Sequence, residues 1–219
     1  MIRGPVLALA PHAPRIAQRH GIPLTLDRPE GVALTFDDGP HPEGTPAVLE
    51  ILAEHGIRAT FFLIGEQVER RPRLAAEIGA AGHEVALHGY RHRVQLRLST
   101  ADVAADLLRG LDAIERATGR RARLHRPPYG VYSPSGLEEV RRLGLKPLLW
   151  SCWGKDWRKF TTPARIARRA TRGLAAGDVI LLHDADFYSS RHSHRRTVAA
   201  LPSILSELKY REIGTVLPV

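Results

Sequence analysis

The 219-residue sequence predicts one α/β domain in which about seven parallel strands form a distorted (β/α) barrel. Three observations predict this fold. From Gly31 onward, short apolar runs alternate with longer amphipathic segments, as in parallel strands joined by helices. A hydrophobic content of 43% suffices for one large core. No Gly-x-Gly-x-x-Gly motif follows the first apolar run, which disfavours an open dinucleotide-binding sheet.

The elements follow in order along the chain. Residues 1–30 are irregular and rich in proline, and we interpret them as an N-terminal leader segment with one short strand at residues 23–26. Residues 31–219 form the main predicted domain, whose expected strands are 32–36, 59–64, 84–87, 123–125, 147–151, 179–182 and 215–217. Capping residues predict helix starts between these strands: Thr45 before Pro46, Ser99 with Asp102, Ser133 before Pro134, and Thr162 before Pro163. Gly56 and Gly119 predict helix ends.

The composition narrows the function classes. The formal net charge is +9, which fits a solvated basic surface, attraction to an anionic polymer, or nucleic-acid binding. No nucleic-acid-binding motif is present and only 6% of residues are aromatic, so we expect no nucleic-acid partner. No apolar run could span a bilayer, and residues 5–10 are too short an apolar run for a persuasive signal peptide. We expect a monomer, and the single Cys152 cannot form an intramolecular disulfide.

Polar side chains cluster just after the predicted strands. The carboxyl ends of parallel strands meet on one face of a barrel, where active sites lie. We therefore expect residues far apart in sequence to converge on this face: Asp37 and Asp38, His88 to His92, Arg126 to Tyr129, Trp153 to Trp157, and His183 with Asp184.

Two of these clusters predict a divalent-metal site. Adjacent carboxylates Asp37 and Asp38 repel each other, and a cation bound to one relieves this and leaves the other free as a base. His88 and His92 are four residues apart, which places both imidazoles on one side of a helical turn. With Asp38 they make three protein ligands, the pattern of a catalytic zinc site. Each motif alone also fits an acidic turn or a pair of surface histidines.

The remaining clusters suggest supporting roles. Arg126 can hold a carboxylate ionised, and His183 can act as a general acid oriented by a nearby carboxylate. Tyr129, Trp157 and Leu181 can line a small apolar pocket, although Trp and Leu are more often plain core residues. The loop of residues 184–196 matches no motif, and we expect Asp186, His192 and His194 in it to be solvated rather than to bind substrate.

Taken together, the five clusters from Gly31 onward resemble the polysaccharide deacetylases, carbohydrate esterase family four with its NodB-like domain. The resemblance implies that Asp37 is the base, that Asp38, His88 and His92 are metal ligands, and that His183 is the acid. It implies that Arg126 tunes Asp37, that Asp156 supports His183, and that the Tyr129 amide stabilises the oxyanion. Pro128, Tyr129, Trp157 and Leu181 match positions that contact substrate. Gly89 and Trp153 depart from the family pattern, which often has Ser or Thr and Asp at these positions.

The resemblance implies hydrolysis of N-acetyl groups from a polymer containing N-acetylglucosamine, such as peptidoglycan or chitin. The implied metal is Zn²⁺, with Co²⁺, Mn²⁺ or Ni²⁺ as alternatives. This substrate class favours the cell envelope or the extracellular space. Two other functions stay open: an amidohydrolase of the same fold that acts on a small or cyclic amide, and a non-enzymatic domain that binds glycan or nucleic acid.

Overall fold

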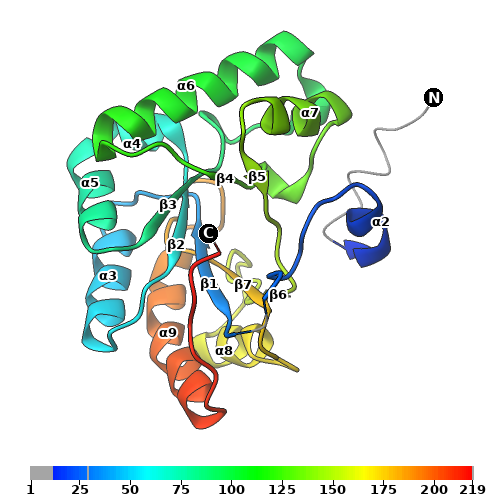
Figure 1. Cartoon of the computed structure of the whole chain (residues 1–219). Coiled ribbons are helices and arrows are strands. Elements are labelled where there is room, and N and C mark those ends of the chain that lie inside the picture. Colours follow the sequence, from blue (N-terminus) through cyan, green and yellow to red (C-terminus); the bar gives the residue numbers. More distant parts are fainter. Residues whose placement is uncertain (1–11, 29, 219) are drawn as a thin grey trace.

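A computed structural model describes residues 12–28 and 30–218 of the chain. Within these residues, a single parallel sheet contains seven strands, in the spatial order β5-β4-β3-β2-β1-β7-β6. Their bounds are β1 Ala33–Asp37, β2 Thr60–Leu63, β3 Glu84–Leu87, β4 Leu124–His125, β5 Lys146–Pro147, β6 Cys152–Trp153 and β7 Val179–His183. The curled sheet confirms the predicted distorted (β/α) barrel (Figure 1).

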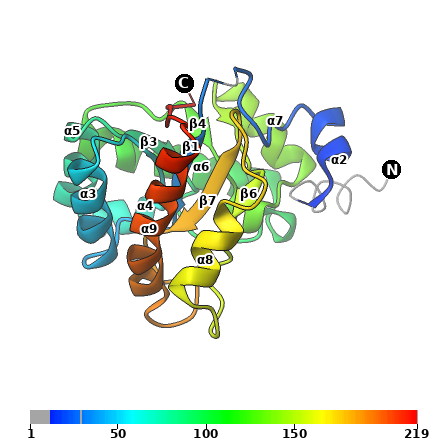
Figure 2. The same ribbon diagram turned by 90° about the horizontal axis from the view of Figure 1, so that it is seen from below.

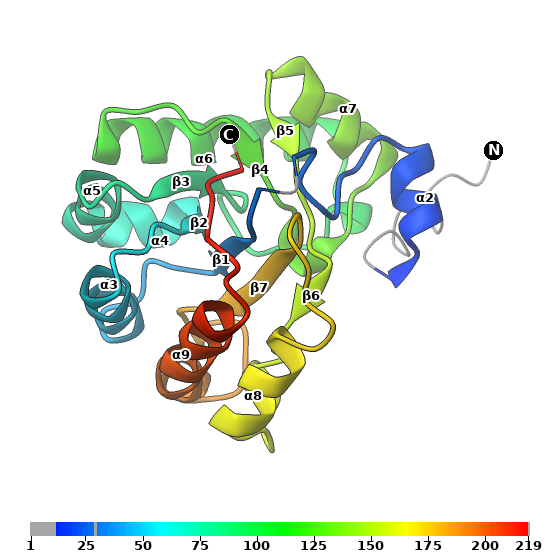
Figure 3. The same cartoon turned by 60° about the horizontal axis from the view of Figure 1, so that its bottom comes forward.

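Helices surround the outer side of the sheet (Figure 3). Helices α8 and α9 lie side by side next to β7 (Figure 2). The α-helices are α2 Pro14–Arg19, α3 Gly44–Glu54, α4 Gly65–Arg70, α5 Pro72–Ala80, α6 Thr100–Thr118, α7 Pro134–Arg142, α8 Pro163–Ala170 and α9 Ser193–Tyr210, and the short 3₁₀ helices are η2 Gln95–Arg97 and η3 Pro128–Gly130. None of the described helices is long and apolar enough to cross a membrane.

Three of the predicted helix caps are confirmed. The side chains of Ser99, Ser133 and Thr162 each accept a hydrogen bond from a backbone N–H in the first turn of α6, α7 and α8. Thr45 is not a cap, because α3 begins one residue earlier. Its hydroxyl accepts a hydrogen bond from the His41 N–H at 2.7 Å and donates one to Asp184. Thr45 therefore ties the turn after β1 to the residue that follows β7.

Two of the expected strands are wrong in detail. The strand expected at residues 147–151 ends at Pro147, because the carbonyls of Leu148 and Leu149 accept hydrogen bonds from the Arg126 side chain. Residues 215–217 form only one bridge, between Thr215 and Val32, rather than a strand. The seventh strand is instead β6, which pairs with β7.

The segment before β1 packs on the domain. Ala17 and Ile22 belong to the hydrophobic core, and the Pro23 carbonyl accepts a hydrogen bond from the Leu149 N–H at 2.9 Å. The strand expected at residues 23–26 is a single antiparallel bridge between Thr25 and Asp178. Residues 1–11 of the expected leader lie outside the described residues, so the boundary at residue 30 stays a prediction.

Candidate active site

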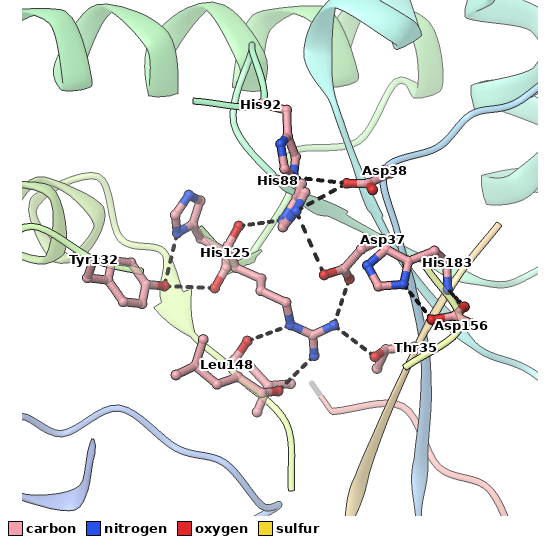
Figure 4. A network of polar contacts seen from close by, with 12 residues as sticks. Thr35, Asp37, Asp38, His88, His92, His125, Tyr132, Leu148, Asp156 and His183 are labelled. Carbon is pink, nitrogen blue, oxygen red and sulfur yellow. Dashed lines mark hydrogen bonds and ion pairs between the residues drawn. The ribbon is translucent and has the colours of Figure 1, made fainter. Parts of the chain in front are cut away.

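The predicted convergence at the carboxyl ends of the strands is confirmed (Figure 4). Asp37 is the last residue of β1 and lies beside His183, the last residue of β7, in the parallel register. His88 directly follows β3, and Arg126 directly follows β4. The curl of the sheet therefore gathers these side chains from four strands into one buried site.

Asp38, His88 and His92 form a group whose ligand atoms all lie within 4.8 Å of one another. The Nε2 atoms of His88 and His92 lie 3.5 and 3.3 Å from Asp38 Oδ1. This oxygen is buried and has no hydrogen-bond partner among the described residues. Burial lowers the pKa of both histidines to about 3, so their rings are neutral and can donate lone pairs. A buried carboxylate oxygen facing two neutral imidazole nitrogens fits a divalent cation.

The segment from His88 to His92 is an irregular loop, not the helical turn that the spacing suggested. It bends at Gly89, whose φ of +89° strains any residue with a Cβ, which explains why glycine occupies this position. The Asp106 carboxylate on α6 accepts hydrogen bonds from the Tyr90 and Arg91 N–H groups at 2.7 and 3.3 Å. Asp106 thus braces the loop, and nothing in the sequence marked it for this role.

Arg126 forms hydrogen bonds with two side chains of β1, Asp37 and Thr35. Its Nη1 donates hydrogen bonds to Asp37 Oδ1 at 2.7 Å and to Thr35 Oγ1 at 2.9 Å. Thr35 and Asp37 lie on the same face of β1 because alternate residues of a strand point the same way. Burial raises the pKa of Asp37, while the Arg126 guanidinium lowers it and only partly offsets the effect of burial. Arg126 thus favours the ionised form of Asp37, the direction expected from the sequence, but burial has the larger effect because Asp37 is almost completely shielded from water.

His183 is held by Asp156, which follows β6. Asp156 Oδ1 lies 2.9 Å from His183 Nδ1, and Oδ2 accepts hydrogen bonds from the His183 N–H at 2.7 Å and the Thr197 hydroxyl at 2.8 Å. Burial lowers the pKa of His183, but Asp156, Asp38 and Asp37 together outweigh burial and raise this pKa to about 10. The imidazole is therefore protonated at neutral pH.

The four residues expected to contact substrate differ in exposure. Tyr129 is 56% exposed, and its ring edge packs on His92 with centroids 4.4 Å apart. Trp157 is partly buried and packs edge-on against His183, with centroids 5.5 Å apart. Leu181 and Pro128 are buried, and Leu181 shares the face of β7 that carries His183. Tyr129 and Trp157 thus pack against a candidate metal ligand and the candidate acid, whereas Leu181 belongs to the core.

The expectation that His194 is solvated is wrong, since it is 3% exposed. His41, Asp186 and His194 form a second group with metal-like spacing, in which Asp186 lies 3.3 Å from each imidazole. His41 Nδ1, however, accepts hydrogen bonds from the backbone N–H groups of Glu43 and Gly44, so the ring proton is on Nε2 and points at Asp186. A protonated nitrogen cannot bind a metal, and we describe this group as a polar cluster in which two imidazoles face the Asp186 carboxylate. It connects the turn after β1 to the segment after β7, whose residues 193–196 belong to α9 and not to the expected loop.

Comparison with known proteins gives a consistent match. A sequence profile described as polysaccharide deacetylase matches residues 27–148. A peptidoglycan-N-acetylglucosamine deacetylase of Bacillus cereus is 35% identical over 180 residues, covering 81% of each chain. A chitooligosaccharide deacetylase of Sinorhizobium fredii is 38% identical over 186 residues, covering 82% of this chain and 86% of the relative. The solved structure of a Bc1960 peptidoglycan N-acetylglucosamine deacetylase with a bound naphthyl-substituted N-oxidanyl-benzamide superposes with a TM-score of 0.83 at 28% identity, covering 91% of this chain and 92% of that chain.

Proposed function

Because the chain belongs to the polysaccharide deacetylase family, we propose that it hydrolyses N-acetyl groups from a polymer containing N-acetylglucosamine and releases acetate. One observation carries the proposal: a three-residue ligand group, Asp38 with His88 and His92, lies beside a second carboxylate, Asp37, and a protonated imidazole, His183. A base, an acid and a metal group in one site are the parts that amide hydrolysis needs. Residues 31–219 would form the catalytic domain.

We propose that Asp38, His88 and His92 hold one divalent ion. Two nitrogen ligands and one oxygen ligand suit Zn²⁺, and such a mixed set also accepts Co²⁺, Mn²⁺ or Ni²⁺. An ion in this position supplies a Lewis acid that polarises the amide carbonyl and lowers the pKa of the attacking water.

Asp37 is proposed as the general base. Arg126 occupies Oδ1, which leaves Oδ2 to take the proton from water. Because burial raises the pKa of Asp37, its carboxylate is a stronger base than a solvated one. The positive charge of Arg126 stabilises the ionised carboxylate of Asp37 in its buried position.

His183 is proposed as the general acid. Its Nδ1–H is bonded to Asp156, so Nε2 is the nitrogen that gives a proton to the departing amine. The backbone amide of Tyr129 would stabilise the oxyanion. Of the four residues expected to contact substrate, the exposed Tyr129 and the partly buried Trp157 would contact the sugar, whereas Pro128 and Leu181 are buried. Water adds to the carbonyl carbon, the C–N bond breaks, and the products are acetate and a free amino sugar.

Acetate release from N-acetylglucosamine oligomers tests the proposal. We expect equal amounts of acetate and free amine, loss of both after chelation, and recovery when Zn²⁺ is added back. A small cyclic ureide is assayed in parallel. Ring opening of the ureide without acetate release would favour the other amidohydrolase function, and inactivity of the metal-loaded protein on both substrates would reject the proposal.

A further inference from the structure

The two histidines of the proposed metal site are held in different ways. His88 Nδ1 lies 2.8 Å from the Arg126 carbonyl, so the ring donates a hydrogen bond there and turns Nε2 toward Asp38. Such outer hydrogen bonds orient most metal-binding histidines. His92 has none: its Nδ1 is buried, and no described residue forms a hydrogen bond with it. Its orientation must therefore come from another contact.

Two aromatic rings contact the His92 imidazole: Tyr129 meets it edge-on, and Tyr188 lies parallel to it. The parallel ring of Tyr188 stacks on the His92 imidazole with centroids 4.3 Å apart and planes 8° from parallel. Tyr188 lies in the loop of residues 184–192 between β7 and α9, which matches no motif. The stack covers one face of His92 and leaves its Nε2 pointing at Asp38 Oδ1.

Tyr188 is itself held firmly by helix α4. Its hydroxyl donates a hydrogen bond to Glu66 Oε1 at 2.9 Å and accepts one from Gln67 Nε2 at 3.2 Å. Gln67 is buried, and its Oε1 accepts a hydrogen bond from Arg71 Nη1 at 2.8 Å. Phe187 packs on His41, with centroids 4.9 Å apart, and so anchors the loop at the neighbouring residue.

We propose that Tyr188 is a positioning residue for His92, and that its stacked ring replaces the hydrogen bond that orients His88. This inference rests on the proposed function, because it takes His92 as a metal ligand. Tyr188 touches no reacting atom in this proposal. Its effect is on how well the three ligand atoms are arranged before the ion binds.

Metal affinity of the apo protein tests the proposal, measured by competition with a chromophoric chelator for Zn²⁺. We expect Tyr188→Ala to weaken Zn²⁺ binding about 10–100-fold, the usual loss when an outer partner of a ligand is removed. Tyr188→Phe keeps the ring and should bind within about 3-fold of wild type, while losing only the bonds to α4. Phe187→Ala is the control for the loop, since the Phe187 ring packs on His41 and on the edge of Tyr188, with centroids 4.9 and 6.3 Å apart, but forms no ring contact with His92. Circular dichroism of each apo variant establishes that it is folded.

The outcomes separate the two proposals. Wild-type affinity in Tyr188→Ala would overturn the positioning role, as would an equal loss in Tyr188→Ala and Phe187→Ala, which would assign the effect to the loop as a whole. If Tyr188→Ala does not fold, Tyr188→Leu is measured with the same expectation. Failure of the wild-type protein to bind any divalent ion would overturn the proposed metal site and this inference with it.

Discussion

The Arg126 guanidinium donates a 2.7 Å hydrogen bond to Asp37 Oδ1, and both side chains are buried. Removing one member of a buried pair leaves an uncompensated charge, which typically costs about 3–5 kcal/mol. We therefore expect Arg126→Met to lower the free energy of unfolding by about this amount in urea denaturation. Arg123→Met is the control, because Arg123 is exposed and its 3.4 Å contact with Glu84 is worth about 1 kcal/mol at most. Equal small losses in both variants would contradict the compensating role of Arg126.

Asp37 and Asp38 are neighbours with different proposed roles, and matched substitutions separate them. Asp38→Asn should lose metal, since it removes the charged ligand. Asp37→Asn should retain metal and lower kcat by about 10²–10⁴-fold, the usual contribution of a general base. Metal content by atomic emission and acetate release on the same samples check this. Loss of metal in Asp37→Asn with retention in Asp38→Asn would reverse the two roles.

The alkaline limit of activity depends on His183. Its acid form is lost as the pH rises through its pKa of about 10, so kcat should fall in that range. Burial lowers this pKa and Asp156 raises it, so Asp156→Asn should move the alkaline limb of the pH profile to lower pH. Thr197→Val removes only the hydroxyl bonded to Asp156 and should shift the limb less. An unchanged limb in Asp156→Asn would show that His183 is not the titrating acid.

Stability should fall in acid because of the buried His83. Burial lowers its folded-state pKa to about 4, below the ordinary 6.5. Between these pH values the unfolded chain binds more protons, so the free energy of unfolding decreases as the pH falls from about 6.5 to 4. The Ala59 N–H donates a hydrogen bond to His83 Nδ1 at 3.1 Å. In His83→Asn the amide oxygen can accept this bond instead, and asparagine does not titrate. The free energy of unfolding, measured by urea denaturation between pH 4 and 6.5, should depend on pH less steeply in this variant than in wild type, by about 1 kcal/mol per pH unit. An equal slope in both proteins would contradict the role of His83 in acid destabilisation.

Much of the site could be predicted because its residues sit at strand ends. Apolar runs in the sequence locate the strands β1, β3, β4 and β7. Because parallel strands end on one face of the barrel, the residues at the ends of these strands are expected to lie together: Asp37, His88, Arg126 and His183. Local chemistry also identifies the caps of α6, α7 and α8. These predictions need only periodicity and the short-range preferences of single residues.

The remainder depends on contacts between distant segments. The strand expected at residues 147–151 ends early because Arg126 takes the carbonyls of Leu148 and Leu149. The positive φ of Gly89 turns the His88–His92 segment out of a helix. His194, at the start of α9, is buried against His41 of the turn after β1, and Tyr188 is held by the contact of its loop with α4. No local pattern encodes such long-range pairings.

Anomalous diffraction at the zinc edge, from crystals grown with Zn²⁺, examines the proposed metal centre itself. We expect one strong peak bonded to Asp38, His88 and His92 at about 2.0–2.2 Å, with Asp37 outside bonding distance. A peak that includes Asp37 as a ligand, a peak at the His41–Asp186–His194 cluster alone, or the absence of any peak at the three ligands would contradict the proposed site and the hydrolysis built on it.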